Sequence, residues 1–390
     1  MKQKEIGLYV HIPFCKQKCY YCDFVSYANK QEMVEQYINC LNKEIIKYGT
    51  ENKIMSAHGL EPEYIIKTIY IGGGTPSFID ENYILSIIKT IKQNFKINEN
   101  AEITIEVNPG TANKDKLQAY KNCGINRLSI GLQAVQDQIL KKIGRIHTYQ
   151  NFETTYQNAK DVGFNNINVD LMIDLPDQTL EDVKESVKTI LSLKPEHISV
   201  YSLILEENTK MYEMVNSKAV NIASDEEERQ MYWYVKQTLG KNKYYQYEIS
   251  NFAKPGFEAK HNLDCWNQKE YIGVGAAASS FIDNKRYSNT SNLNQYINNI
   301  ESNTSNLNLQ LEENLDYISQ MNEYMMLGLR KIEGVNIFEF ERKFNKNPIV
   351  MYSTILEKLN HEGLIEVNGT NIRLTNKGID FANLVWEEFC

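Results

Sequence analysis

The sequence contains no apolar run that approaches the roughly 20 residues of a membrane-spanning helix. It has no excess of positive charge either, because 42 Lys and Arg residues face 50 Asp and Glu residues, for a net charge of −8. This balance argues against nucleic acid or an anionic membrane surface as the partner. Residues 1–5 lead directly into the first predicted strand, so we expect no signal peptide and a cytoplasmic protein.

Complete nucleotide-binding signatures are also missing. The turn Gly72-Gly73-Gly74-Thr75-Pro76 follows a predicted strand, but it lacks the lysine that a Walker phosphate loop requires. No dinucleotide fingerprint accompanies the strand and helix units described below. Three successive glycines instead allow a backbone to approach a ligand closely, with a plain tight turn as the alternative.

Cysteine is scarce and clustered: of seven in total, Cys15, Cys19 and Cys22 form a C-x3-C-x2-C pattern after a short apolar run. A zinc site usually has four N or S ligands, and no local fourth ligand is present. Three thiolates are typical of a cubane iron–sulfur cluster whose fourth iron stays open to a small molecule. A disulfide loop and an incomplete zinc site are the alternatives, and the odd total favours a reducing cytosol. Cys40 and Cys123 are expected to be core or capping residues.

From residue 6 to about residue 205, short β-rich runs alternate with helical periods. The predicted strands are Ile6–His11, Ile66–Ile71, Ile103–Val107, Arg127–Leu132, Ile167–Met172 and His197–Leu203. The predicted helices are Met33–Tyr48, Glu81–Phe95, Lys114–Cys123, Asp137–Gly163 with a break near Gly144, and Leu180–Leu193. This alternation predicts parallel βαβ units and an α/β fold, here a partial TIM-like (β/α)6 barrel.

The sequence after the predicted barrel changes character. We expect a helix at Glu226–Leu239, an extended segment at Tyr244–Phe252, and a polar surface connection at Asn284–Gln310, which holds nine asparagines. The last part has a winged-helix-like pattern: helices at Leu315–Ile332, Ile337–Phe344 and Val350–His361, strands at Leu364–Val367 and Ile372–Leu374, and a helix to Phe389. Its recognition-helix position offers only Lys358 against two glutamates, so we expect no DNA binding. The predicted domains are 1–210, 211–310 and 311–390.

Polar side chains stand where the apolar barrel strands end. Glu106 lies in the last residues of the third strand, Gln133 directly follows the fourth, and Asp170 begins the run that ends the fifth. Arg145 comes twelve residues after Gln133. In barrels of this kind the C-terminal strand ends meet at one face, where functional residues gather. A Glu106–Arg145 salt bridge, with Gln133 capping a loop, is the alternative. Carboxylate, amide and guanidinium groups on one rim suit a zwitterionic amino acid with ribose hydroxyls.

The cysteine spacing after a first strand resembles the signature of the radical S-adenosylmethionine (SAM) superfamily. The form Tyr-x-His-Ile-Pro-Phe-Cys at residues 9–15 is similar to the branch of HemN, the oxygen-independent coproporphyrinogen III dehydrogenase, and HemW, a heme chaperone. The resemblance implies a 4Fe-4S cluster on Cys15, Cys19 and Cys22, whose electron cleaves SAM into methionine and a 5′-deoxyadenosyl radical. It assigns SAM contacts, and no catalytic role, to Tyr9, Tyr21, Gly73, Gly74, Thr75, Glu106, Gln133, Arg145, Asp170 and Ser202.

A second motif, His-Asn-Leu-Asp-Cys-Trp at residues 261–266, is similar to the His-Asn-x-x-Tyr-Trp motif of HemW proteins. A histidine near an aromatic residue can ligate heme, so His261 is the candidate heme residue, with a hydrogen-bonding loop histidine as the alternative. The chain departs from the family where Cys265 replaces tyrosine and Ser279 replaces histidine. Asp174 and Asp177 stand where glycine is common.

Three features favour HemW over HemN. HemN carries a fourth cysteine two residues after the third, whereas Asp23 and Phe24 follow Cys22 here. HemN also has an N-terminal extension before the tyrosine that stands at position 9 in this chain, and the motif at 261–266 belongs to HemW. We therefore expect a heme chaperone that binds the cluster, SAM and heme. The alternatives are oxidative decarboxylation of coproporphyrinogen III, and another radical SAM enzyme acting on tetrapyrroles, such as a methyltransferase.

The expected partners follow from the same resemblance. They are heme or a related tetrapyrrole, an apo-hemoprotein that receives heme, and an electron donor for the cluster. The oligomeric state is left open, a homodimer included. A purely structural cluster protein would bind no SAM at all.

Overall fold

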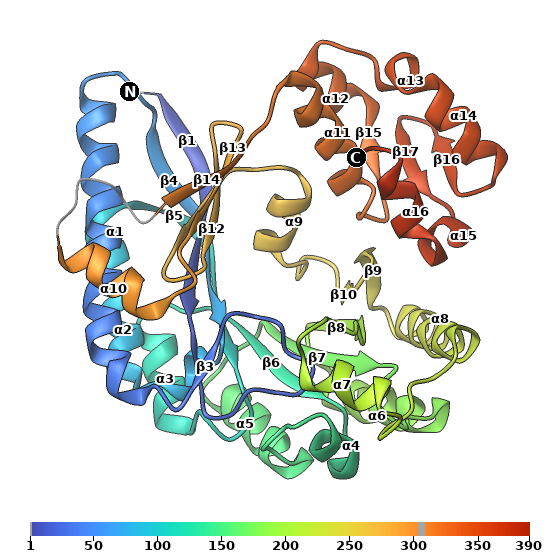
Figure 1. Ribbon diagram of the computed structural model, residues 1–390, viewed down its shortest axis with the longest axis horizontal. Helices are drawn as coiled ribbons and strands as arrows, with labels where there is room; N and C mark the ends of the chain where they lie inside the picture. The colour runs from blue at the N-terminus through green and yellow to red at the C-terminus, as the bar shows by residue number, and fades with distance from the viewer. Residues whose placement is uncertain (1, 303–308) are drawn as a thin grey trace.

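A twelve-stranded sheet forms the framework of the computed structural model, which describes residues 2–302 and 309–390 (Figure 1). The strand order is β14-β13-β12-β11-β1-β4-β5-β6-β7-β8-β10-β9. Six strands follow one another in chain order and pair in parallel, as the predicted (β/α)6 barrel requires. They are β1 (Gln3–Ile12), β4 (Glu63–Gly73), β5 (Lys96–Val107), β6 (Arg127–Gln133), β7 (Ile167–Ile173) and β8 (His197–Ser202).

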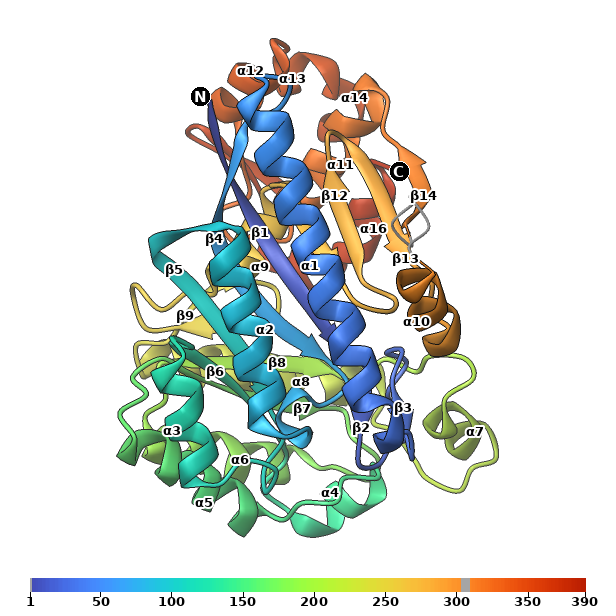
Figure 2. The ribbon, with the colours of Figure 1, turned by 90° about the vertical axis from the view of Figure 1, so that its left-hand side faces the viewer.

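Helices cover the outer face of these strands, as Figure 2 shows for α1 and α2. They are α1 (Val34–Ala57), α2 (Glu81–Asn94), α3 (Lys114–Asn122), α4 (Asp137–Lys142), α5 (Tyr149–Asp161) and α6 (Leu180–Leu193). Leu8 and Val10 of β1 are fully buried in the same hydrophobic core as Leu41 of α1. Side chains alternate along a strand, so Tyr9 and His11 of β1 face the inside of the barrel.

Further strands extend the sheet at both ends. After α7 (Lys210–Asn216) and α8 (Asp225–Lys241), the antiparallel strands β9 (Tyr245–Glu248) and β10 (Asn251–Ala253) join β8. A short helix, α9 (Lys260–Trp266), precedes β11 (Tyr271–Val274), which pairs in parallel with β1. The antiparallel strands β12 (Ser279–Ile282), β13 (Lys285–Asn289) and β14 (Leu309–Asn314) complete this end, with α10 (Leu293–Glu301) before β14.

The segment Asn284–Gln310, predicted as a polar surface connection, contains regular structure in its described part. β13 and α10 occupy it, while residues 303–308 lie outside the described residues. Tyr296 of α10 is fully buried beside α1, and Asn289 donates a hydrogen bond to the buried Glu44 of α1 at 2.9 Å. The many asparagines gave the segment a polar composition, although a few apolar residues at helical spacing are enough to bury one face of a helix. Composition alone therefore did not predict α10.

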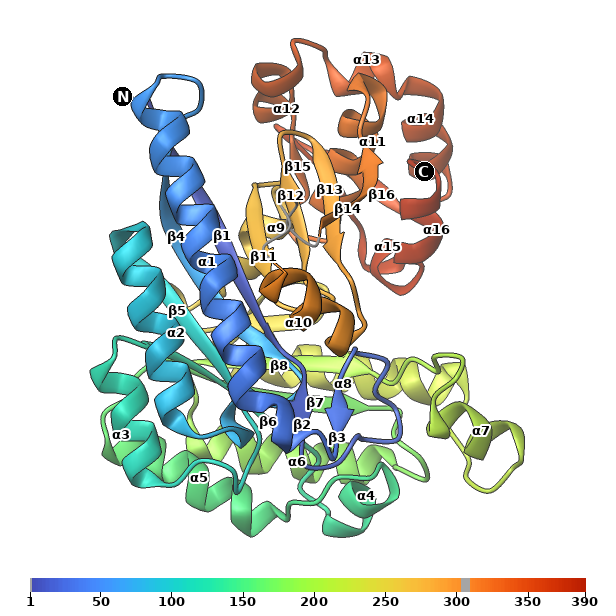
Figure 3. The same cartoon turned by 60° about the vertical axis from the view of Figure 1, so that its left-hand side comes forward.

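The C-terminal domain has a hydrophobic core of its own and lies beside the β11–β14 end of the sheet (Figure 3). Its elements are α11 (Tyr317–Gly328), β15 (Val335–Asn336), α12 (Ile337–Phe344), α13 (Pro348–Met351), α14 (Ser353–His361), β16 (Ile365–Asn368), β17 (Asn371–Leu374), α15 (Asn376–Asp380) and α16 (Ala382–Glu387). The predicted helix at Val350–His361 is interrupted at Tyr352, and the last helix is interrupted at Phe381. Lys358, the base at the recognition-helix position, pairs with Glu388 at 2.5 Å.

The predicted α/β class, with a partial barrel and a smaller helical domain, is confirmed. The division of the chain at residues 210 and 310 stays a prediction. Cys40 is fully buried in α1 and Cys123 caps α3, as expected of core and capping residues. Within residues 2–302 and 309–390, no helix has the length and apolar character of a membrane span.

Candidate functional site

The three clustered cysteines lie around a loop at the end of β1. β2 (Phe14–Cys15) pairs with β3 (Tyr27–Ala28), so the chain between them loops out. The Cys15 sulfur accepts a hydrogen bond from Thr75 Oγ1, and the Cys19 sulfur accepts one from Arg145 Nη1, each at 3.5 Å. All seven cysteines are described and are free thiols, so the disulfide alternative is wrong.

Backbone hydrogen bonds hold this cysteine loop against two barrel segments. Tyr20 N donates to Ile143 O, after α4, at 3.0 Å, and Met211 N of α7 donates to Tyr20 O at 2.7 Å. Among the described residues, no three His, Cys, Asp or Glu side chains are placed around a single metal ion. A cubane cluster takes each thiolate on a different iron, so its ligands do not have to meet at one point.

The glycine turn after β4 passes directly beside the cysteine loop. Gly74 N donates to Ile12 O at 2.9 Å, and a Cβ at Gly74 would lie 3.0 Å from the Cys15 sulfur. Gly73 has a φ of +112°, where glycine is favoured, and a Cβ there would lie 2.6 Å from the His11 ring. Only glycine therefore lets this turn pass so close to the Cys15 sulfur and the His11 ring. The backbone of the turn lies directly next to the sulfur.

Glu106 lies inside the barrel with both carboxylate oxygens engaged. Oε1 accepts a hydrogen bond from the Tyr70 hydroxyl at 2.9 Å, and Oε2 accepts one from Gly73 N at 3.1 Å. Burial raises the pKa of Glu106 to about 7, and the hydrogen bonds oppose this rise. A cationic ligand at Glu106 would favour the ionised form.

Arg145 reaches the same end of the barrel from the loop after α4. Nη2 donates to Gly131 O of β6 at 2.6 Å, whereas Nε is buried and has no hydrogen-bond partner among the described residues. Glu106 and Arg145 therefore hold different groups, and the alternative of a salt bridge between them is wrong for the described residues. An unpartnered guanidinium N–H beside a cysteine sulfur can donate to an anionic or polar ligand.

The other rim candidates come from β6, β7 and β8. Gln133 is buried at the end of β6 with a φ of +74°. Asp170 accepts a hydrogen bond from Asn168 Nδ2 at 2.6 Å, and burial raises its pKa. Ser202 donates to Glu228 of α8, so the structure places it in a different hydrogen-bond group from the rest of the rim.

Two tyrosines expected at the SAM site take different positions. Tyr21 is half-buried close to Arg145 and Cys19, and desolvation raises its pKa. Tyr9 projects from β1 and shares a 2.9 Å hydrogen bond with His11 Nδ1. Tyr9 also lines a cavity next to the rim, so its side chain could contact a ligand at the rim or in the cavity.

His261 is buried at the N-terminal end of α9, inside the barrel. Glu102 of β5 accepts hydrogen bonds from the backbone N–H groups of Lys260 and His261 at 3.1 and 3.2 Å. His261 Nδ1 shares a 2.9 Å hydrogen bond with Thr68 Oγ1, and the ring stacks on Tyr70 at a centroid distance of 5.3 Å. Burial lowers the pKa of His261 to about 4, so the imidazole is neutral at physiological pH. Nε2 has no hydrogen-bond partner in the described ranges.

A cavity of about 470 Å³ extends from the cysteine loop to His261. Its lining includes Asp23 and Phe24, which distinguish the two branches of the family, and Cys265 and Ser279, two of the departures from the family pattern. Its full lining is Tyr9, His11, Asp23, Phe24, Val25, His261, Cys265, Tyr271, Ala277 and Ser279. Motifs that are distant in the sequence therefore form one wall.

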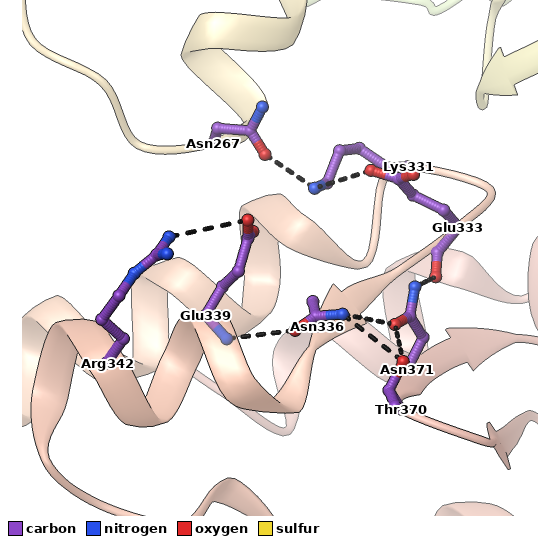
Figure 4. Close-up of polar contacts among 8 residues, drawn as sticks. All are labelled: Asn267, Lys331, Glu333, Asn336, Glu339, Arg342, Thr370 and Asn371. Atoms are coloured by element: carbon purple, nitrogen blue, oxygen red, sulfur yellow. Dashed lines mark hydrogen bonds and ion pairs between the residues drawn. The ribbon is translucent and has the colours of Figure 1, made fainter.

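The far end of α9 contacts the C-terminal domain. Figure 4 shows Asn267 accepting a 2.6 Å hydrogen bond from Lys331 Nζ. The guanidinium of Arg330 lies 4.4 Å from the Trp266 ring and 4.5 Å from the Trp386 ring. One short helix thus forms part of the cavity wall and part of the domain interface.

Sequence reasoning missed Thr68, Tyr70 and His11. Their signal was the alternation along β1 and β4, which places Thr68 and Tyr70 on the same face as Gly72. A register shift between Ile66 and Thr68 interrupts that alternation, so the pattern did not identify the face. Asp174 and Asp177, which replace common glycines, both adopt positive φ of +59° and +53°. Their backbone therefore keeps a conformation that glycine favours.

Comparison with known proteins agrees with these features. Residues 9–190 match the radical SAM superfamily, and residues 315–381 match the HemN C-terminal domain. The structure resembles that of coproporphyrinogen III oxidase (HemN) from Escherichia coli, with a TM-score of 0.83 and 23% identity, over 99% of this chain and 90% of that chain. This likeness shows the shared fold.

Curated relatives match over nearly the whole chain. The heme chaperone HemW of Bacillus subtilis is 37% identical over 382 residues, 98% of each chain. HemW of Lactococcus lactis is 36% identical over 389 residues, which cover 100% of this chain and 98% of the relative. HemW of Escherichia coli is 37% identical over 71% of this chain and 70% of the relative. The chain therefore belongs to the radical SAM superfamily and, within it, to the HemW family of heme chaperones.

Proposed function

We propose that this chain is a heme chaperone that binds a 4Fe-4S cluster, SAM and heme and delivers heme to apo-hemoproteins. The observation that carries the proposal is the cavity, which joins the residues directly after Cys22 to His261. A cargo in this cavity would lie beside the cluster and would reach the motif that resembles HemW. The full-length likeness to HemW chaperones supports the same conclusion.

The cluster and SAM would occupy adjoining positions. Cys15, Cys19 and Cys22 would hold three irons, and the glycine turn would expose backbone beside Cys15 to a ligand on the fourth iron. Glu106 suits the ammonium of SAM, and the unpartnered Nε of Arg145 suits a carboxylate or hydroxyl oxygen. Bound there, with an external one-electron donor, the two groups would supply radical chemistry.

His261 is the group best placed to hold heme iron. Thr68 engages Nδ1, which leaves Nε2 for a metal, and low basicity keeps the ring neutral, as a ligand must be. The rings of Tyr9 and Tyr271 and the side chain of Phe24 offer apolar surface in the same cavity. The cavity therefore combines a free imidazole nitrogen with aromatic walls.

Anaerobic reconstitution followed by two parallel assays tests the proposal. Hemin titration should give a saturable Soret change in the wild type, and His261→Ala should alter the spectrum or weaken affinity by about tenfold or more. The exposed His58 provides a control, because His58→Ala leaves the cavity intact. An unchanged titration in His261→Ala would remove this residue from the heme site.

The second assay addresses the enzymatic alternative. The reconstituted protein is incubated with coproporphyrinogen III, SAM and a reductant, and protoporphyrinogen IX is measured. We expect hemin binding without turnover. Stoichiometric or catalytic product formation would replace the chaperone proposal by oxidative decarboxylation.

A further inference from the structure

Tyr70 of β4 lies between the two proposed binding sites. Its hydroxyl donates a 2.9 Å hydrogen bond to Glu106 Oε1, in the SAM rim. Its ring stacks on His261, with a centroid distance of 5.3 Å and an interplanar angle of 29°. The ring also stacks on Tyr9 at 6.3 Å and 27°. A single side chain therefore contacts the carboxylate of one site and the imidazole of the other.

The position of the His261 ring depends on two contacts. Thr68 holds Nδ1 and so determines which nitrogen is free. Tyr70 supports the plane of the ring, because the stacked geometry leaves the imidazole little room to tilt toward β4. A change in how firmly Tyr70 is held therefore changes how well His261 is oriented for a ligand.

We propose that Tyr70 is a positioning residue that couples SAM binding at Glu106 to heme binding at His261. The inference rests on the proposed function and extends it, because it makes the two sites thermodynamically dependent on each other. SAM bound at the rim strengthens the hold on Tyr70, and the better-held ring orients His261 for heme.

The physical reason lies in the acceptor of the Tyr70 hydroxyl. Without SAM, a Glu106 carboxyl with a pKa of about 7 is partly protonated near neutral pH. An ammonium group at Glu106 keeps the carboxylate ionised, and a hydrogen bond to an ionised acceptor is about twice as strong as a neutral one. A ring that is already ordered costs less conformational entropy when heme binds. Linkage then requires heme to tighten SAM binding by the same factor.

The test measures both affinities on the anaerobically reconstituted full-length protein, without reductant, so that SAM is not consumed. Hemin is titrated with and without saturating SAM, and SAM is dialysed to equilibrium with and without hemin. In the wild type we expect SAM to lower the Kd for hemin about fivefold, and hemin to lower the Kd for SAM equally.

Three variants assign the coupling to the side chain. Tyr70→Phe keeps the ring and loses the hydroxyl, so both ligands should bind with a coupling factor close to one. Tyr70→Leu loses the ring as well and should also weaken hemin binding in the absence of SAM. Tyr64→Phe removes a hydroxyl from the same strand away from both sites and should keep the fivefold factor.

The outcomes separate the inference from the proposed function. Equal hemin affinities with and without SAM in the wild type would overturn the coupling while leaving the chaperone proposal intact. A fivefold factor retained in Tyr70→Phe would show that Tyr70 only fills the barrel. No hemin binding, or binding independent of His261, would overturn the proposed function and this inference together.

Discussion

The proposed SAM-binding rim and the neighbouring cavity are built in different ways. The rim takes its groups from successive strands: Gly73, Glu106 and Gln133 from the ends of β4, β5 and β6, and Asp170 from the middle of β7. The cavity takes its lining from β1, the cysteine loop, α9, β11 and β12, which come from opposite ends of the sheet-forming sequence. The rim is thus a product of one repeated unit, whereas the cavity is a product of long-range assembly.

The rim and the cavity also differ in the chemical groups that they present. The rim holds carboxylate and guanidinium groups whose atoms are largely engaged with backbone or neighbouring side chains. Of the residues that line the cavity, Asp23 alone carries a carboxylate. Aromatic and imidazole rings form much of the rest of the lining. The difference supports the proposed assignment of a small zwitterion to the rim and a larger, flatter ligand to the cavity.

Removal of the cluster cysteines is the change with the largest expected effect on the comparison. Cys15→Ser, Cys19→Ser or Cys22→Ser should each abolish stable incorporation of iron and sulfide, because each thiolate would hold a separate iron. Iron and sulfide content per chain after anaerobic reconstitution measures this. Cys390→Ser, at an exposed thiol, should load normally. Normal loading of any of the three test variants would contradict the assignment of that cysteine.

Glu106→Gln tests the rim alone. Loss of the charged partner should weaken SAM binding roughly 10- to 100-fold, while hemin affinity measured without SAM changes little. Because burial raises the pKa of Glu106 to about 7, the ionised form gains population as pH rises. Wild-type SAM affinity should therefore increase from about pH 6 to about pH 7.5, and Glu106→Gln should lose that increase.

Equilibrium dialysis of labelled SAM measures the effect of Glu106→Gln. The matched control is Glu99→Gln, at an exposed position of the same strand. A variant that binds SAM as tightly as the wild type across this pH range would remove Glu106 from the rim.

Thr68→Val tests the cavity alone. It removes the hydroxyl bonded to His261 Nδ1 while keeping the shape of the side chain. Hemin affinity should fall about tenfold, because partners of a ligating histidine fix its orientation. Thr68→Ser keeps the hydroxyl and should retain most of the affinity. An equal loss in Thr68→Val and Thr68→Ser would point to packing as the cause.

Arg330→Ala is expected to have the smallest effect, at the domain end of α9. It removes a cation held between Trp266 and Trp386, which should lower the free energy of unfolding by about 1 kcal/mol. Chemical unfolding followed by tryptophan fluorescence measures the loss. Arg330→Lys keeps a positive charge and should retain part of the stabilisation. SAM affinity should not change, because the rim does not include α9. An unaltered unfolding midpoint would show that this contact contributes little.

Much of the rim could be predicted from the sequence, because local patterns locate the strands and functional residues of such barrels gather at the C-terminal ends of the strands. Glu106, Gln133 and Asp170 stand at predictable positions once the strands are found, and the observed strands reproduce the predicted ones within a few residues at their C-terminal ends. Ser202 was expected at the rim from the family resemblance alone, and its hydroxyl is engaged with Glu228. The direction of a side chain at a strand end depends on the neighbouring helix, which local pattern does not encode.

By itself, the sequence determined the succession of parallel βα units, the cysteine spacing and the histidine, cysteine and tryptophan of the motif at 261–266. Only the tertiary structure decided that these form one cavity. Parallel pairing of β11 with β1 sets Tyr271 beside Gly7, and α9 enters the barrel between Glu102 and Thr68. Such contacts join segments far apart in the chain. Their register is specified by the packing and hydrogen bonds of the whole sheet, which no local periodicity contains.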